Sequence, residues 1–369
     1  MPATSNLAGL PRQELALAVV EGEGSVTNVI GEKILGPLPI SYRNAHYIKA
    51  QLGASLGLRH IGSNKYVRAM GTRYERATAT LTDGTLTVTP RGLEISVPRE
   101  MILDYKDKFD PLAFFSGRFG QEIGVITKEY LIAAQVFSTS AFIKGAFTNS
   151  TVAYTEANRN KTDGTGAAPV HDISNSVIRI KNNGENPDTV IMSFPVWTYV
   201  STCWNTLQFV RGQFAGVSTV TLENFTASLN VYGIKQVLVG EQYYNSQPDS
   251  VQPADGALSQ VWSNAYMVVC KAGMSAKSET EGTLVPSLTG LGANVFWEGF
   301  DNNGMGTMQP VAKDYDFQGG GGYYIETYPS WETESEIIRI KMSHNPTITN
   351  NRCGDGIATQ ASNASGPLT

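Results

Sequence analysis

The stretch DPLAFFSGRFGQEIGVITKEYLIAAQVF, residues 110–137, predicts one long helix and decides how the rest of the chain is interpreted. Asp110 can accept hydrogen bonds from the free amides of the first turn, and Pro111 suits the first helical position, where no donor is needed. Apolar side chains recur at steps of three and four, which places them on one helix face. They are Leu112, Phe115, Phe119, Ile123, Ile126, Tyr130, Ala133 and Phe137. We expect this face to be buried along a helix roughly 40 Å long.

Two different segments precede this helix. Residues 1–50 carry glycines and prolines but little periodic pattern, which indicates an arm without a core of its own, laid across another surface. Residues 52–97 alternate and are rich in Thr, Arg and Ser, which indicates a long β-excursion with a hairpin turn at Asp83-Gly84. An isolated two-stranded ribbon is marginal in water, so we expect the excursion to lean on another surface.

The central part of the chain switches between strand and helix signals, which is typical of a compact α/β domain. Strands are expected at Val177–Ile180, Val190–Met192, Ile234–Val239 and Tyr266–Cys270, and helices at 195–210 and 222–230. Thr221 is the expected N-cap of the second helix, and Gly233 is its expected stop.

The last third of the chain is β-rich. Strands are expected at 295–300, 323–327 and 336–342, with Ile338, Ile340 and Met342 on one face of the last of them. Residues beyond Asn350 are mostly Ser, Ala, Gly and Asn, so we expect them to fray.

Composition narrows the class of protein. The chain has 369 residues, of which 41% are hydrophobic and 17% are charged, against a usual charged fraction of about 25%. A low fraction of charged residues is typical of a subunit whose surface is covered by neighbouring subunits, although a large globular enzyme can also have it. The net charge of -5 argues against a protein that binds nucleic acid through clustered cations and counterion release. No apolar run reaches the ~18 residues of a membrane span, so we expect no membrane partner.

The sequence offers no convincing site for catalysis, a metal or a cofactor. The histidines His46, His60, His171 and His344 and the cysteines Cys203, Cys270 and Cys353 lack metal-ligand spacing. Ser275 lacks the second glycine of a nucleophile elbow. Glu332, Glu334 and Glu336 could be paired catalytic carboxylates, but three acids at period two are more often one solvated strand face. We therefore expect a protein that is not an enzyme.

Four segments carry a resemblance to the major capsid proteins of tailed bacteriophages, which share the HK97-type shell fold. They are residues 93–98 with 107–111, the helix at 110–137, the block 195–209 with 231–240 and 261–264, and the strand 337–342 running into Asn345-Pro346. The resemblance covers nearly the whole chain, and its specificity lies in the order of elements rather than in one motif.

The resemblance implies an α+β, HK97-like capsid fold with five parts. These would be an N-terminal arm at 1–51, an extended β-hairpin E-loop at 52–97, a P-domain at 98–185 with its spine helix at 111–137, a central α/β A-domain at 186–330, and a return to the P-domain with a C-terminal tail at 331–369. We identify no charged scaffolding segment ahead of the arm in this sequence. The resemblance then implies that scaffolding is a separate protein or that the chain is the mature form.

The resemblance also implies a function. The chain would assemble into hexamers and pentamers of an icosahedral phage head that encloses double-stranded DNA without sequence-specific binding. It would be a virion component assembled in the host cytoplasm, with separate scaffolding, portal and decoration proteins as further partners. One alternative is an encapsulin-type compartment around a cargo enzyme, and a second is a soluble α/β enzyme.

Cations in the β-excursion are the candidate subunit contacts. They are Lys65, Arg68, Arg73, Arg76 and Arg91. They could simply keep an exposed hairpin soluble, but the resemblance favours contacts with acids of a neighbouring subunit. Some members of the resembled family link a lysine of this excursion covalently to an asparagine of another subunit. Lys65 is a lysine at the corresponding place, but such a crosslink is the less favoured reading here.

Overall fold

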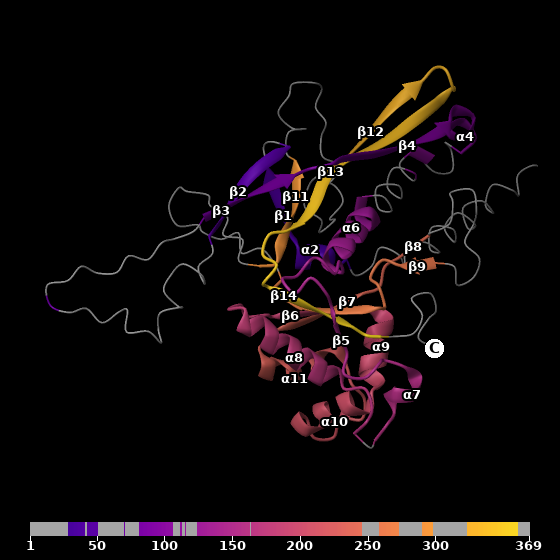
Figure 1. Cartoon of the computed structure of the whole chain (residues 1–369). Coiled ribbons are helices and arrows are strands. Elements are labelled where there is room, and N and C mark those ends of the chain that lie inside the picture. The colour runs from indigo at the N-terminus through magenta and orange to yellow at the C-terminus, as the bar shows by residue number, and fades with distance from the viewer. Residues whose placement is uncertain are drawn as a thin grey trace, which may run out of the picture.

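The structure of this chain is a computed structural model. It describes residues 29–40, 43–50, 70, 81–105, 111–112, 115, 124–162, 164–245, 258–272, 290–297 and 323–360. Figure 1 shows an α+β fold with a lower lobe, where helices surround one sheet, and an upper lobe built on long strands.

The lower lobe is organised around a five-stranded sheet with the order β5-β14-β10-β6-β7. The strands are β5 (Thr148–Asn149), β6 (Thr189–Ser193), β7 (Gln236–Gly240), β10 (Tyr266–Cys270) and β14 (Gly354–Ala358). β6 and β7 are parallel, whereas β10 runs antiparallel to both β6 and β14. The helices are α7 (Glu156–Arg159), α8 (Pro169–Asn182), α9 (Phe194–Thr202), α10 (Trp204–Gln213), α11 (Leu222–Leu229) and the 3-10 turn η5 (Asn230–Tyr232).

This sheet separates two hydrophobic cores. Val190 and Met192 of β6 pack into a core shared with α8, α9 and α11, while Ile191 between them packs into a second core. That second core contains Trp262 and the helix α6 (Thr127–Val136) of the upper lobe. Because successive strand residues point to opposite faces, the fully buried strand β6 serves both cores.

The upper lobe is organised around the 14-residue strand β13 (Ser335–Ile348), the longest described strand. The other elements are α2 (Gly31–Ile34), β1 (Gly36–Ile40), β2 (Asn44–Ala50), β3 (Leu81–Thr87), β4 (Pro90–Pro98), α4 (Arg99–Tyr105), β8 (Tyr243–Asn245), β9 (Leu258–Gln260), β11 (Gly292–Trp297) and β12 (Tyr323–Ser330). β13 pairs with β4, β11 and β12, and β1 extends this sheet beside β11. Two ribbons, β2–β3 and β8–β9, complete the lobe.

Several sequence predictions are confirmed by these elements. The strand at Tyr266–Cys270 is β10, and Ile338, Ile340 and Met342 are buried on one face of β13. The side chain of Thr221 accepts a hydrogen bond from the Asn224 amide at the start of α11. Gly233 has φ +91°, the left-handed conformation that ends a helix at low cost.

The helix predicted at 110–137 is described in part. Residues 111–112, 115 and 124–136 are helical, with a π-helical turn at 124–126, while Phe119 and Ile123 lie outside the described residues. The side chains of Leu112, Phe115 and Ile126 are half-buried, and Phe137 is buried.

The prediction that Tyr130 is buried is wrong, because its side chain is 44% exposed, although its ring makes an edge-to-face contact with Tyr244. The buried positions of α6 are Lys128, Glu129, Ile132, Ala133 and Val136. Glu129 takes the interior position because hydrogen-bond donors from two other segments converge on it, as described below.

The described residues between 29 and 50 pack against the rest of their own subunit. They form α2, β1 and β2, and Ile30, Ile34 and Leu35 are buried in the same core as α6. Each of these short elements buries few side chains, so the periodicity is weak although Ile34 and Leu35 are fully buried. Residues 1–28 lie outside the described part of the chain.

The turn predicted at Asp83-Gly84 is also wrong, because β3 continues through both residues and pairs with β2. Gly84 lies opposite Tyr47, and a Cβ at this position would approach the Tyr47 ring to 2.4 Å. The glycine therefore makes room for an aromatic ring across the ribbon rather than a reversal of the chain.

Two further predictions are corrected by tertiary packing. The strand expected at Val177–Ile180 belongs to α8, whose buried residues Val170, Ile173, Val177 and Ile180 repeat with helical spacing after Pro169. The helix expected at 195–210 is two helices, α9 and α10, which meet at the extended residue Cys203.

The residues after Asn350 do not all fray. Gly354–Ala358 form β14, an internal strand of the lower sheet, and Phe142 and Phe147 pack so closely against Gly354 and Gly356 that a Cβ would clash. The low apolar content of this stretch reflects ring contacts that only glycine permits. Residues 361–369 lie outside the described part of the chain.

Candidate functional site

Glu129 of α6 is the centre of a buried junction between three segments. The residue is 1% exposed. Its Oε1 accepts hydrogen bonds from the backbone amides of Ile30 and Gly31 and from the indole Nε1 of Trp262, each at 3.0 Å, and its Oε2 accepts from Gly31 at 2.9 Å. One carboxylate thus joins the start of α2, the helix α6 and Trp262, which lies between β9 and β10.

The neighbouring residue Lys128 makes a second link to α2, because its ammonium pairs with the carboxylate of Glu32. Burial lowers the pKa of Lys128 to about 8, against the opposing charge of Glu129. Burial raises the pKa of Glu129, and the hydrogen bonds from Ile30, Gly31 and Trp262 oppose that rise. Two adjacent side chains of α6 therefore fix the N-terminal stretch that begins at Ile30.

His344 lies in β13 and is 3% exposed. Among the described residues, no hydrogen-bond partner reaches Nδ1 or Nε2 of its ring. Burial lowers the pKa of His344 to about 4, and the nearby charges of Lys128 and Arg91 act in the same direction. The imidazole is therefore neutral at pH 7 and sits where an added positive charge would be repelled.

The upper lobe ends in a tip formed by α4 and the turn 331–334 between β12 and β13 (Figure 1). The Arg99 amide donates to the Glu334 carbonyl at 3.0 Å, and the Arg99 guanidinium lies 3.6 Å from the Glu336 carboxylate. The same guanidinium lies 4.8 Å from the centre of the Trp331 ring. Arg99 thus fastens the helix to the turn, yet Trp331 stays 77% exposed.

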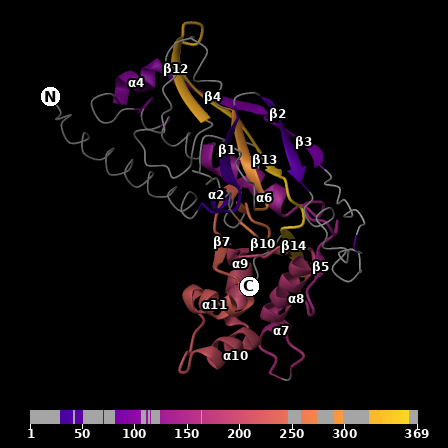
Figure 2. The same ribbon diagram turned by 90° about the vertical axis from the view of Figure 1, so that its left-hand side faces the viewer.

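The opposite end of the upper lobe is the ribbon β2–β3, as Figures 1 and 2 both show. The described base of this ribbon is packed within the subunit, because Leu86 and Val88 join a small core with β1 and β11. Arg43 lies over the Trp297 ring at 4.5 Å and closes that core.

Of the five predicted contact residues, the structure describes only Arg91. Arg91 is exposed near the start of β4, beside the ribbon. Lys65, Arg68, Arg73 and Arg76 lie in the segment between β2 and β3 and outside the described residues, so the structure does not bring them together. Their role in subunit contacts stays a prediction.

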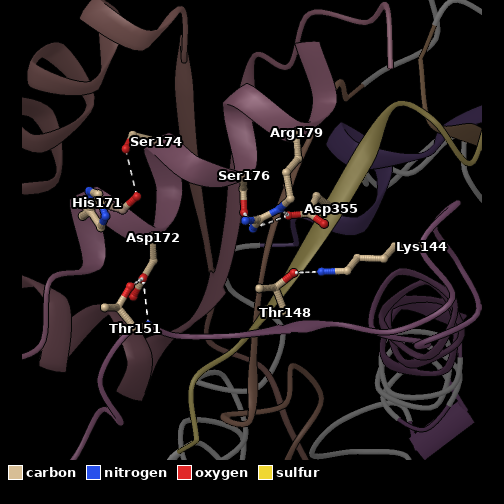
Figure 3. A network of polar contacts seen from close by, with 9 residues as sticks. All are labelled: Lys144, Thr148, Thr151, His171, Asp172, Ser174, Ser176, Arg179 and Asp355. Carbon is tan, nitrogen blue, oxygen red and sulfur yellow. Dashed lines mark hydrogen bonds and ion pairs between the residues drawn. The ribbon is translucent and has the colours of Figure 1, made fainter. Parts of the chain in front are cut away.

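A polar network on α8 holds the lower lobe together, and Figure 3 shows it from close by. Asp172 accepts from the amide and hydroxyl of Thr151 at 2.9 and 2.6 Å and from the hydroxyl of Tyr154 at 3.1 Å. Two turns further along α8, Nε of Arg179 donates a hydrogen bond to the carboxylate of Asp355 in β14 at 2.8 Å. These contacts tie α8 to two other segments, which is a structural role.

The described residues give no support for catalytic chemistry. They contain no group of three or more His, Cys, Asp or Glu side chains placed to hold a metal ion. The thiols of Cys203, Cys270 and Cys353 are buried, and burial raises the pKa of each, so none is an activated nucleophile. Glu332 and Glu334 lie in the turn beyond β12 rather than on one strand face. In the part of the chain that is described, no helix is long and apolar enough to span a membrane.

Sequence reasoning missed both the Glu129 junction and the Arg99 tip. The Lys128-Glu129 pair inside an apolar helical stretch was the one available signal for the junction, since charged residues are rarely buried without partners. The tip has no such signal, because Arg99 is far in the sequence from Trp331 and Glu336 and meets them only through the pairing of β4 with β13.

No known family and no curated protein matches the sequence. Solved structures do match the fold. A phage-related protein from Bordetella bronchiseptica RB50 aligns with TM-score 0.55 and 13% identity over 91% of this chain and 94% of its own. The capsid of cyanophage P-SCSP1u aligns with TM-score 0.51 and 11% identity over 91% of this chain and 88% of its own.

An encapsulin complex from Synechococcus elongatus PCC 7942 is also similar, with TM-score 0.42 and 9% identity over 97% of this chain and 91% of its own. Most of the structural neighbours are phage capsid proteins of the HK97 type. This chain therefore has the α+β fold of phage capsid proteins over about nine-tenths of its length.

Proposed function

We propose that this protein is a structural subunit that assembles with copies of itself into a closed shell. The observation that carries the proposal is the extent of the fold match, 91% of this chain against 94% of the phage-related protein and 88% of the cyanophage capsid protein. Both chains match over nearly their whole length, which supports a shell subunit built on this fold alone. The small fraction of charged residues, 17%, also supports a surface that neighbours cover.

The finer proposal is a major head protein of a tailed phage. Copies would form hexamers and pentamers of an icosahedral shell around double-stranded DNA, as a virion component assembled in the host cytoplasm. The net charge of -5 supports a container that holds DNA without adhering to it. The five-part division into arm, E-loop, P-domain, A-domain and tail belongs to this proposal, as do separate scaffolding, portal and decoration proteins.

Electron microscopy of the purified full chain tests the proposal. We expect closed particles of uniform size in negative stain. A monomer by light scattering across a wide range of protein and salt concentrations would overturn the shell and would favour a soluble α/β enzyme instead.

A second measurement separates a phage head from an encapsulin-type compartment. Particles isolated from cells that express the chain with its natural partners should absorb more strongly at 260 nm than at 280 nm if they contain DNA. Small particles that carry protein alone would favour the compartment with an enzyme cargo.

A further inference from the structure

Between Ile338 and Pro346, the buried face of β13 carries one ionisable side chain. Buried residues alternate along this face through Ile340 and Met342, and His344 is the next of them. Neither nitrogen of its ring has a hydrogen-bond partner among the described residues. An imidazole buried in this way is stable only while it is neutral, because an unpaired buried charge is costly.

The charged groups that act on this ring are both cations. Lys128 belongs to α6, which packs on β13 (Figure 1), and Arg91 belongs to β4, where it lies opposite Met342 of β13. β11 pairs with His344 itself through Phe296, and neither β11 nor its neighbour β1 contains a titratable residue. Protonation of His344 therefore adds a third positive charge where two already lie.

The two carboxylates of the α2–α6 junction are already engaged. Glu32 pairs with Lys128, and the Glu129 carboxylate accepts hydrogen bonds from two backbone amides of residues 30 and 31 and from the Trp262 indole. Neither carboxylate can turn toward a His344 imidazolium without giving up these contacts. Within the described part of the chain, the added charge has no counterion available.

Lys128 and Glu129 do not open this contact in mild acid. Burial lowers the pKa of Lys128 to about 8, so its ammonium is largely formed at pH 7 already. Burial raises the pKa of Glu129, so the folded chain takes up that proton more readily than the unfolded chain, and acid favours the folded state. Burial lowers the pKa of His344 from 6.5 to about 4, which has the opposite effect between these two pH values.

The contact between β13 and α6 lies where the two lobes meet. α6 shares its core with Ile191 of β6 and Val268 of β10, two strands of the lower sheet. β13 leads through residues 349–353 into β14 of the same sheet. The other lower-lobe core, around α8, α9 and α11, includes no described residue of α6 or β13. A separation of β13 from α6 therefore leaves that core packed.

We propose that His344 is an acid-sensitive latch between β13 and α6. Its protonation places an uncompensated charge against Lys128 and Arg91, and this charge is relieved when β13 separates from α6 and water reaches the ring. The core around α8 stays folded in the opened state, so the change is a local opening. The latch belongs to the single subunit and does not depend on self-assembly, so it can fail while the proposed shell stands, and the reverse.

Hydrogen exchange of the full, unassembled chain tests the latch. Amides of β13 and α6 should exchange about twentyfold faster at pH 5 than at pH 7 after correction for the intrinsic rate, because the pKa of His344 rises from about 4 to 6.5 on opening. This exchange should depend little on low concentrations of urea, since a local opening exposes little surface. A urea dependence as steep as that of the α8 amides would overturn the latch, because the acid effect would then be complete unfolding.

The variant His344→Gln isolates the contribution of the histidine. Glutamine is polar but does not titrate, so the difference in exchange between pH 5 and pH 7 should disappear. His171→Gln, at an exposed position of α8, is the matched control and should keep the difference. A twentyfold difference that persists in His344→Gln would overturn the latch.

NMR of 13Cε1-labelled histidine follows the titration directly and does not require His344→Gln to fold. The chain has four histidines, and we expect one of the four signals to titrate well below pH 6.5. Arg91→Gln should raise that midpoint because it removes a repelling charge, whereas Arg211→Gln, an exposed change on α10, should not. Four midpoints near 6.5, or a midpoint that Arg91→Gln leaves unmoved, would overturn the latch.

Discussion

Gly31 and Glu129 are fitted to each other so closely that no other residue could replace the glycine without movement. A Cβ on Gly31 would lie 2.5 Å from Oε2 of Glu129 and 2.9 Å from Cδ1 of Ile132. The same glycine donates its amide to both carboxylate oxygens. Removing the side chain at position 31 is thus what lets a buried carboxylate reach the backbone of α2.

Changing Gly31→Ala should lower the free energy of unfolding by about 1–3 kcal/mol, because the methyl group forces the carboxylate or Ile132 aside. Urea denaturation followed by tryptophan fluorescence measures the change. Gly212→Ala is the matched control, since a Cβ there would meet nothing within 4 Å and the position is helical. Equal stability of the two variants would show that Gly31 is not under this constraint.

Glu129→Ala should lower the free energy of unfolding by about 3 kcal/mol, because it leaves the amides of Ile30 and Gly31 and the indole of Trp262 without their acceptor. Gln135→Ala on the exposed side of α6 serves as the control and should change stability by less than about 0.5 kcal/mol. Hydrogen exchange should also speed up at Ile30 and Gly31 in the Glu129 variant alone. Unchanged exchange at these two amides would contradict the junction.

Two truncations separate the packed N-terminal stretch from what precedes it. Removing residues 1–28 should leave the melting temperature of the unassembled subunit nearly unchanged. Removing residues 1–36 should lower it clearly, because Ile30, Ile34 and Leu35 are buried in the core around α6. Burial of three large aliphatic side chains contributes several kcal/mol. The prediction fails if differential scanning calorimetry gives both truncated chains the same melting temperature.

The free energy of unfolding should fall as the pH is lowered, because His344 takes up a proton more readily in the unfolded chain. Its pKa in the folded chain is lowered to about 4, from 6.5 in the unfolded chain, so the folded state binds this proton less tightly. The contribution of the neutral imidazole is complete above pH 6.5 and is lost as the pH falls toward 4. A difference of that size corresponds to about 3 kcal/mol. Urea denaturation between pH 4 and pH 7 measures the loss.

The control for this pH dependence is His171→Gln, since His171 is exposed on α8. We expect this variant to follow the wild-type curve, whereas His344→Gln should remove most of the loss between pH 6.5 and pH 4. Parallel curves for wild type and His344→Gln would show that other groups cause the acid sensitivity.

The sequence by itself determined those elements whose periodicity reflects burial on one side. β10, the buried face of β13, the capped start of α11 and the glycine that ends the following turn η5 follow from local pattern, because alternation, a Thr cap and a glycine stop act within a few residues. The order of these elements was also enough for the resemblance to phage capsid proteins, whose fold this chain has.

Only the tertiary structure decided where polar and glycine-rich positions belong. Glu129 is buried in place of Tyr130 because donors from residues 30, 31 and 262 meet its carboxylate, and no local pattern encodes partners so far away. β14 is an internal strand because Phe142 and Phe147 pack over its glycines, and α2 is fixed by side chains a hundred residues later. Periodicity records which side chains avoid water, whereas these positions depend on contacts that exist only after the chain has folded.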